Sequence, residues 1–315
     1  MPHLHLKRKR DLSAFRRLAI GTWRTTYDPQ AYGRITLEMD QTIRYIEAFR
    51  RATGKRLTVT HLMAKAAGRV LKEVPDANAI LRWNRIYLRE EISVFFQVAM
   101  RDPKTGQIDL SGVKIDDPQD KSLAAIVDEF EEHAGRVRAG EDRDLEATRQ
   151  AFRWVPALLL NKALDALDFL VYKLNLNLSW AGLPHDPYGS IMITNIGTLG
   201  LEEAFAPLLP HGHVGIIVAI GAIQDAPVVR GGEVVVGKTM PLSATFDHRL
   251  LDGAHAAKMV SMVKTWLEDP FRYFDPIPGP SGAEAEAAEG EAEPAAESAP
   301  AAEGDSAAPI PQADP

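Results

Sequence analysis

The chain of 315 residues contains no cysteine. It therefore cannot form disulfides, a thiolate metal site or a cysteine nucleophile. It also lacks an uninterrupted apolar run of about 18 residues, the length that a membrane-spanning helix requires. Charged residues interrupt its most apolar segment, 158–178, so no span is expected. No apolar core of a secretion signal follows the basic N-terminus, and we expect a cytoplasmic protein.

Charge is distributed unevenly along the chain, which carries 36 Lys and Arg against 43 Asp and Glu, a net charge of -7. Residues 281–315 contain nine acidic residues, thirteen alanines and no basic residue. Such a composition cannot bury enough apolar surface to offset its ordering entropy, so we predict a disordered Ala/Glu/Pro-rich acidic tail over 277–315. The remaining chain is nearly neutral. The acidic net charge of the whole chain argues against a nucleic-acid partner.

The N-terminus has the opposite charge, with Lys7, Arg8, Lys9 and Arg10 in succession. We expect a basic arm over 1–11 that is either a solvated helix start or a segment that pairs with a partner's surface.

The hydrophobic pattern predicts an α/β protein with a mixed sheet, because strand-like and helix-like segments alternate irregularly. Strands are expected at 34–40, within 85–100 (two strands), and at 190–195, 214–223, 233–236 and 240–246. Helices are expected at 40–52, 61–74, 121–138 and 254–267. The apolar segment 152–178 is expected to be a buried helix pair or a subunit-contact element.

One stretch combines a strand with titratable side chains: MPLSATFDHRLLDGA, residues 240–254. His248 follows the strand, and Asp252 and Gly253 come four and five positions later. A histidine with an ordinary pKa near 6.5 suits a general base at neutral pH. The spacing alone fits a structural ion pair as well as it fits catalysis.

A second stretch, GSIMITNIGTLG at 189–200, brings Thr194 and Asn195 to the end of an apolar strand. It contains neither a phosphate-binding GxxxxGK[ST] loop nor a GxSxG nucleophile elbow. A hydroxyl at this position could donate to a developing oxyanion, although threonine at a strand end is common.

Together, the HRxxDG motif and the [ST]-N-[IL]-G turn resemble the acyltransferase (E2) catalytic domain of 2-oxoacid dehydrogenase complexes. Segments 15–23, 121–132 and 214–223 also resemble this family, and the resemblance covers 12–276. It implies a chloramphenicol acetyltransferase-like two-layer sandwich, in which helices flank a mixed β-sheet.

The resemblance implies that His248 removes the proton from the thiol of coenzyme A or dihydrolipoamide. Thr194 would donate to the tetrahedral oxyanion, and transfer would proceed without an acyl-enzyme. Asp252 would pair with an arginine of the N-terminal helix, Arg16 or its neighbour Arg17.

The resemblance also implies that Asn195 and Gly221 lie near the coenzyme A arm. It further implies a homotrimer, in which His248 of one subunit meets Thr194 of the next. No metal is expected, because His211 and His213 have no evident third ligand.

Some features depart from the family pattern. We expect no lipoyl domain in this sequence, so a lipoyl group would arrive on another protein, such as a 2-oxoacid dehydrogenase component. The sequence also has an apolar insertion at 141–187. Two alternatives to an acyltransferase that uses acyl-CoA therefore stay open: a non-catalytic E2-like scaffold and a small-molecule acetyltransferase.

Overall fold

The computed structural model describes residues 4–10, 29–101, 108–139, 156 and 159–278. The chain divides into two units, Met1–Ile277 and Pro278–Pro315, and the described residues belong almost entirely to the first. The predicted tail lies almost wholly outside the described residues, and so does Arg16.

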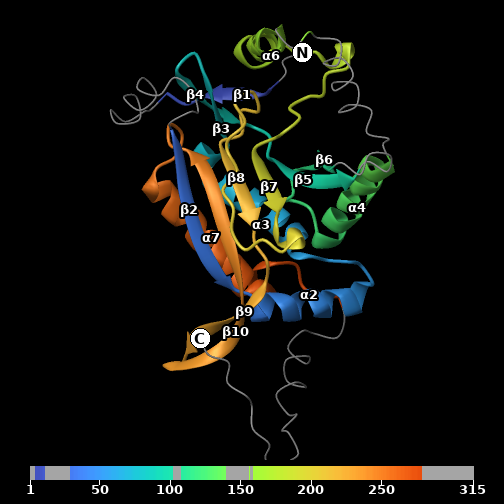
Figure 1. Cartoon of the computed structure of the whole chain (residues 1–315), viewed down its shortest axis with the longest axis vertical. Helices are drawn as coiled ribbons and strands as arrows, with labels where there is room; N and C mark the ends of the chain where they lie inside the picture. Colours follow the sequence, from blue (N-terminus) through green and yellow to red (C-terminus); the bar gives the residue numbers. More distant parts are fainter. Residues whose placement is uncertain (1–3, 11–28, 102–107, 140–155, 157–158, 279–315) are drawn as a thin grey trace, which may run out of the picture. The chain divides into compact units, whose positions relative to one another are not determined.

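A mixed sheet forms the centre of the fold, with the strand order β2-β10-β8-β7-β5-β6 and β9 paired to β10 (Figure 1). Its parallel pairs are β5 with β7 and β7 with β8, and the remaining pairs are antiparallel. The strands are β2 (Gln30–Glu38), β5 (Ser93–Arg101), β6 (Ile108–Asp116), β7 (Ile191–Asn195), β8 (Ile216–Ile220), β9 (Gln224–Arg230) and β10 (Glu233–Asp247).

Helices cover one face of this sheet and enclose the main core, which contains Leu37, Ile193, Val218 and Leu242. They are α2 (Asp40–Thr53), α3 (Val59–Glu73), α4 (Leu123–Ala139), α7 (Gly253–Glu268) and α8 (Pro270–Tyr273). A smaller cluster that includes Phe95 lies on the other face. The predicted two-layer arrangement of helices on a mixed sheet is therefore confirmed.

Strand β10 is longer than the sequence pattern predicted. The two strands expected at 233–236 and 240–246 are one strand of 15 residues, because the polar residues between them continue the hydrogen bonding to β9 and β2. Strands β9 and β6 were not predicted.

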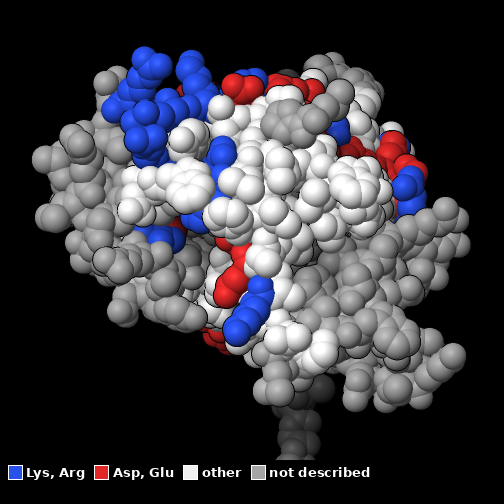
Figure 2. All heavy atoms as spheres, turned by 90° about the horizontal axis from the view of Figure 1, so that it is seen from above, with Lys and Arg blue, Asp and Glu red and all other residues white. Residues whose placement is uncertain are grey.

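A second sheet, β1-β4-β3, consists of β1 (Leu6–Arg8), β4 (Arg85–Arg89) and β3 (Ala79–Arg82). Part of the basic arm is therefore an edge strand, and the expectation of a helix start is wrong for residues 6–8. Lys7, Arg8 and Arg10 are exposed. Figure 2 shows Lys and Arg side chains gathered on one side of this end of the molecule.

The second sheet is covered by α6 (Leu160–Asp168), the π-helix η3 (Phe169–Lys173) and the short η4 (Ser179–Ala181). Val171 and Tyr172 pack against Leu4 and Ile80. Several large apolar side chains of this segment are nevertheless exposed: Leu159, Phe169, Leu170, Leu174, Leu176 and Trp180. The expectation of a buried helix pair is therefore wrong for this segment.

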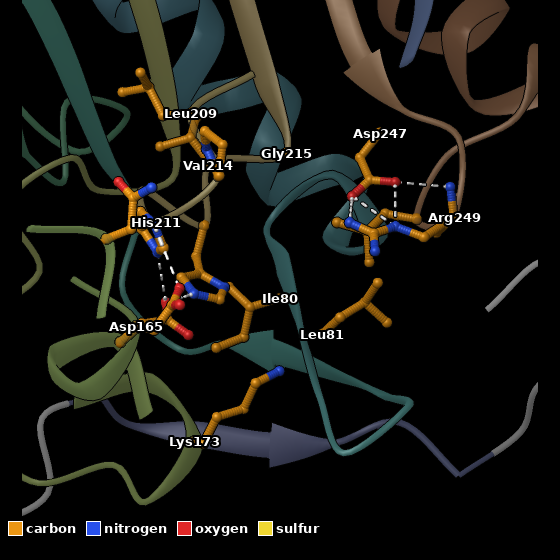
Figure 3. A pocket seen from close by; sticks show the side chains of 15 residues that line it. Ile80, Leu81, Asp165, Lys173, Leu209, His211, Val214, Gly215, Asp247 and Arg249 are labelled. Carbon is orange, nitrogen blue, oxygen red and sulfur yellow. Dashed lines mark hydrogen bonds and ion pairs between the residues drawn. The ribbon is translucent and has the colours of Figure 1, made fainter. Parts of the chain in front are cut away.

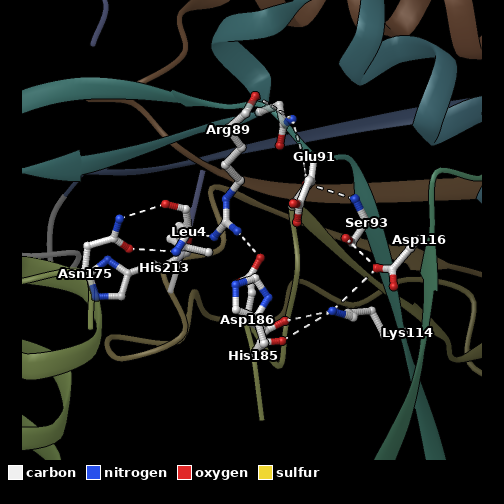
Figure 4. Close-up of polar contacts among 12 residues, drawn as sticks. Leu4, Arg89, Glu91, Ser93, Lys114, Asp116, Asn175, His185, Asp186 and His213 are labelled. Atoms are coloured by element: carbon white, nitrogen blue, oxygen red, sulfur yellow. Dashed lines mark hydrogen bonds and ion pairs between the residues drawn. The ribbon is translucent and has the colours of Figure 1, made fainter. Parts of the chain in front are cut away.

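Polar contacts fasten the segment at both ends (Figure 4). Asn175 exchanges two 2.7 Å hydrogen bonds with the backbone of Leu4. Arg89 forms a buried ion pair with Asp186, where the segment leads into β7. No helix in the described part of the chain is long and apolar enough to cross a membrane.

We expect Gly112→Ala to lower the free energy of unfolding by about 1–3 kcal/mol, because the new methyl group would overpack the core. A Cβ at Gly112 would lie 1.9 Å from the ring of Phe95 on the neighbouring strand. The matched control is Gly135→Ala in α4, where a Cβ meets nothing within 4 Å and the helix gains a better helix former. Urea midpoints that fall equally in both variants would contradict the packing argument.

Candidate active site

The alternation of β10 determines where His248 points. Leu242, Ala244 and Phe246 face the helices, while Ser243 and Asp247 face the opposite side. His248 lies in the turn that follows β10, and the centroids of its ring and that of Phe246 are 6.4 Å apart. The backbone N–H of His248 donates to the carbonyl of Pro29 at 2.7 Å. The imidazole is therefore placed directly after the end of a strand, beside the ring of Phe246.

The residues on either side of His248 in the sequence form a buried ion pair. Arg249 donates from Nε to both oxygens of Asp247, at 3.0 and 3.2 Å, and from Nη2 at 2.6 Å. Its backbone N–H donates to the same carboxylate at 2.9 Å. Both side chains are buried, so the turn that carries His248 has little freedom. These two residues were not predicted, although both stand within the DHR triplet of the motif.

The ion pair forms one wall of a cavity of about 490 Å³ (Figure 3). Helix α6 supplies Asp165 and Asp168 to this cavity. His213 contacts Asp168, and Nε2 of His211 lies 3.9 Å from Asp165. The His-x-His pair thus joins the sheet to α6. Within the described residues, no group of three metal-ligating side chains is assembled.

Asp252 is the N-cap of α7. Its carboxylate accepts from the backbone N–H groups of Ala254 at 3.1 Å and His255 at 3.2 Å, and it lies 2.7 Å from Nδ1 of His255. Nε2 of His255 lies 3.5 Å from Asp76. The expected partner, Arg16, is outside the described residues, so the pairing stays a prediction. The contact between Asp252 and His255 was not predicted from the sequence.

Thr194 and Asn195 end β7, as expected. Asn195 donates from Nδ2 to the hydroxyl of Thr60 in the first turn of α3, at 3.1 Å. That turn is fixed by His61, whose Nδ1 accepts from the backbone N–H of Thr58 at 3.1 Å. Burial lowers the pKa of His61 to about 4, and nearby arginines add to this effect, so the capping imidazole stays neutral.

Gly221 follows β8 and lies beside Asn195, which pairs with Ile220. Its N–H donates to the carbonyl of Pro241 at 2.9 Å. A Cβ at Gly221 would lie 2.1 Å from the carbonyl oxygen of Glu202, so the packing excludes any side chain here. Close packing therefore explains why residue 221 is a glycine. Its expected contact with coenzyme A stays a prediction.

Thr194 and His248 lie at opposite ends of the sheet within one chain. Thr194 is level with Ala219 on β8, which is level with Ser243 on β10. Ser243 precedes His248 by five residues, or about 17 Å along a strand. One copy of the chain therefore does not bring the predicted base and the predicted hydroxyl donor together.

The family model described as 2-oxoacid dehydrogenases acyltransferase (catalytic domain) matches residues 16–152 and 186–274. The chain belongs to this family. The match omits residues 153–185, which lie within the expected insertion.

Curated relatives agree with this assignment. The acetyltransferase component of the Bacillus subtilis acetoin cleaving system is 28% identical over 217 residues, covering 69% of this chain and 43% of the relative. The acetyltransferase component of the pyruvate dehydrogenase complex of the same organism is 42% identical over 81 residues, which are 26% of this chain and 18% of the relative. The aligned region spans less than half of the length of these relatives.

Solved structures of E2 catalytic domains share the fold. A probable dihydrolipoamide acetyltransferase from Listeria monocytogenes superposes with a TM-score of 0.59 at 18% identity, covering 86% of this chain and 98% of that one. The cubic core of a pyruvate dehydrogenase multienzyme complex gives 0.57 at 19% identity, with 84% and 93% covered. The expected chloramphenicol acetyltransferase-like fold is confirmed.

We expect Asp247→Ala and Arg249→Ala each to lower the free energy of unfolding by about 3–5 kcal/mol, because each leaves a buried charge without its main partner. The double variant should lose clearly less than the sum, and urea denaturation of all four proteins measures this coupling. The exposed pair Lys72–Asp120, at 3.0 Å, is the control and should couple much more weakly. Additive losses at 247 and 249 would contradict the ion-pair argument.

Proposed function

We propose that this chain transfers an acyl group between coenzyme A and a thiol, such as dihydrolipoamide on another protein, with His248 as general base. The observation that carries the proposal is the placement of His248 at the end of β10, with the buried Asp247–Arg249 pair on either side of it in the chain. A base so fixed can meet an incoming thiol without reorganising.

The proposed mechanism begins with removal of the thiol proton by His248, since a thiol with a pKa near 8.5 is only slightly ionised at neutral pH. The thiolate attacks the carbonyl carbon of the thioester, and a tetrahedral oxyanion forms. Thr194 donates its hydroxyl hydrogen bond to this oxyanion. Collapse of the intermediate expels the second thiolate, which takes the proton from His248. No acyl-enzyme forms, and the protein needs no thiol of its own.

The site would be formed between copies of the chain. Thr194 lies at the opposite end of the sheet from His248, so a neighbouring copy would supply it, and a homotrimer is the assembly that we propose. Asn195 and Gly221 lie beside Thr194 and would arrive with it, next to the coenzyme A arm. The exposed Lys7, Arg8 and Arg10 would provide positive charge for phosphate groups.

The relatives support the type of acceptor. The curated matches are named dihydrolipoyllysine-residue acetyltransferases. A structure of the Azotobacter vinelandii dihydrolipoamide acetyltransferase is described as an investigation of the catalytic role of a serine, a histidine and an asparagine. That histidine and asparagine are four positions apart, as His248 and Asp252 are in this chain.

We expect His248→Ala to abolish transfer from acetyl-CoA to free dihydrolipoamide, because His248 is the proposed base and the variant removes its imidazole. Thioester formation can be followed spectroscopically, with the oligomeric state checked by light scattering. The control is His133→Ala on α4, which should keep full activity. Unchanged activity in His248→Ala would reject the mechanism. A wild-type chain that transfers acetyl only to a hydroxyl would favour a small-molecule acetyltransferase.

A second prediction tests the location of the site. His248→Ala and Thr194→Ala should each be nearly inactive as pure oligomers. Mixed oligomers, refolded or co-expressed, should regain activity at about one quarter of their interfaces, where an intact His248 meets an intact Thr194. Thr194→Ala alone should lower kcat about 10²–10³-fold, the usual effect of losing one oxyanion donor. No recovery in mixed oligomers would show that the two residues do not share a site.

A further inference from the structure

Large apolar side chains are exposed on the segment that covers the second sheet. This segment lies within residues 153–185, which the family model does not match. Its Val171 and Tyr172 are buried against the core beneath. The neighbouring side chains are exposed, and together with a residue of the β3–β4 turn they form what we call the apolar surface: Trp83, Phe169, Leu170, Leu174, Leu176 and Trp180. Exposed apolar patches commonly mark an interaction site.

Contacts within the segment bring these side chains together. The backbone N–H of Leu174 donates to the carbonyl of Phe169 at 2.9 Å, and that of Leu176 donates to the carbonyl of Leu170 at 3.1 Å. The rings of Phe169 and Trp83 meet edge to face, with their centroids 6.0 Å apart. The hairpin of the second sheet and the segment that covers it therefore contribute to the same surface.

Both tryptophans of the apolar surface occupy positions that packing does not explain. Trp83 and Asn84 form the two-residue turn between β3 and β4, with φ angles of 52° and 58°. Such turns favour Asn or Gly, and a positive φ is strained for a bulky residue. Trp83 is nevertheless 54% exposed, and its Nε1 donates to the carbonyl of Lys173 at 3.2 Å. Trp180 is 85% exposed. A strained, exposed tryptophan fits a role in binding better than a role in folding.

The charges next to the apolar surface are mainly positive. Residues 169–185 include no Asp or Glu. Arg85 directly follows the β3–β4 turn, Lys162 lies on α6, and both are exposed. The acidic residues of α6, Asp165 and Asp168, line the cavity of Figure 3, where they face histidines.

The arrangement of the second sheet adds to this basic border. Arg8 on β1 is level with Tyr87 on β4, so the exposed Arg10 lies further towards the β3–β4 turn. The exposed Glu90 and Glu91 follow β4 at its other end, away from the turn. Figure 2, which views this end of the molecule, shows uncharged side chains over much of its middle and Lys and Arg side chains gathered on one side.

An apolar surface with a basic border fits an anionic partner. Contact with a second copy of the same surface would bring like charges together, which is unfavourable. Exposed Trp, Phe and Leu side chains on a short helical segment, beside Lys and Arg, are typical of segments that lie in a membrane interface. We propose that the apolar surface and its basic border dock the protein on a bilayer that contains anionic lipids, with the segment in the plane of the interface. This docking does not depend on acyl transfer.

Sedimentation of the full chain with lipid vesicles tests the docking. We expect binding to vesicles of phosphatidylcholine and phosphatidylglycerol in equal parts, and much weaker binding to phosphatidylcholine alone, because the basic border attracts anionic headgroups. An ionic strength of about 1 M, at which the Debye length is about 3 Å, should weaken binding to the mixed vesicles. Equal binding to both kinds of vesicle, or binding to neither, would overturn the proposal.

The variant Trp83→Asn separates docking from folding. Asparagine adopts a positive φ more readily than tryptophan, so the hairpin should form at least as well. We expect the affinity for the mixed vesicles to fall by at least about tenfold, since a large apolar side chain no longer enters the interface. The control is Val234→Thr, because Val234 is 71% exposed on β10 and is not part of the apolar surface. A folded Trp83→Asn variant with the wild-type affinity would overturn the proposal.

A pair of charge variants tests the basic border. We expect the double variant Arg85→Gln/Lys162→Gln to lower the affinity for the mixed vesicles about fivefold for each charge removed. The double variant Arg44→Gln/Arg51→Gln is the matched control, because it removes the same charge from exposed positions on α2. It should bind nearly as well as the wild-type chain. Equal losses in the two double variants would show that only net charge matters and would overturn the proposed surface.

Light scattering without vesicles tests whether the apolar surface instead joins copies of this chain. We expect Trp83→Asn to have the molar mass of the wild-type protein, because the surface is free in solution. A lower molar mass in this variant would show that the surface is an interface between copies, and it would overturn the docking on a bilayer.

Discussion

Strand β10 is held by hydrogen bonds to β2, β8 and β9 along most of its 15 residues. A slip of one residue would exchange the two faces of the strand, so this register decides every feature of the site. It directs Phe246 towards the helices and Asp247 away from them. His248 follows in the turn, with its ring beside that of Phe246. The ion pair and the neighbour of the candidate base both follow from this one alternation.

The ion pair of Asp247 and Arg249 is better understood as a positioning device than as a source of stability. Two buried charges lose hydration, and well-packed apolar residues are often as stable in such a place. The pair instead restricts the conformation of the turn. Several hydrogen bonds join Arg249 to the carboxylate of Asp247, and His248 lies between these two residues in the chain. The segment around α6 lines the cavity behind the pair, so an element outside the family match faces Asp247 and Arg249 across this cavity.

The hydrophobic pattern predicted the mixed sheet, and the motifs placed His248 and Thr194 at strand ends, because each of these depends on a local pattern of residue types; the catalytic roles of the two residues stay predictions. The Asp247–Arg249 pair was missed, since spacing does not reveal which side chains turn back towards each other. Strand β9 was missed because its hairpin side chains are mostly exposed and give no hydrophobic period. The apolar residues near α6 were expected to form a buried helix pair or a subunit contact, because composition gives the hydrophobicity of a segment and not what it packs against.

The proposed site divides its parts between one chain and its neighbour. The candidate base and the ion pair that fixes its turn belong to the same chain. The proposed oxyanion donor is about 17 Å away along the sheet, so a second copy would provide it. Positioning of the base would then depend on one chain, whereas stabilisation of the transition state would require two. A variant that weakens assembly should therefore lower kcat far more than it disturbs the turn that carries the base, since only the former depends on the neighbouring copy.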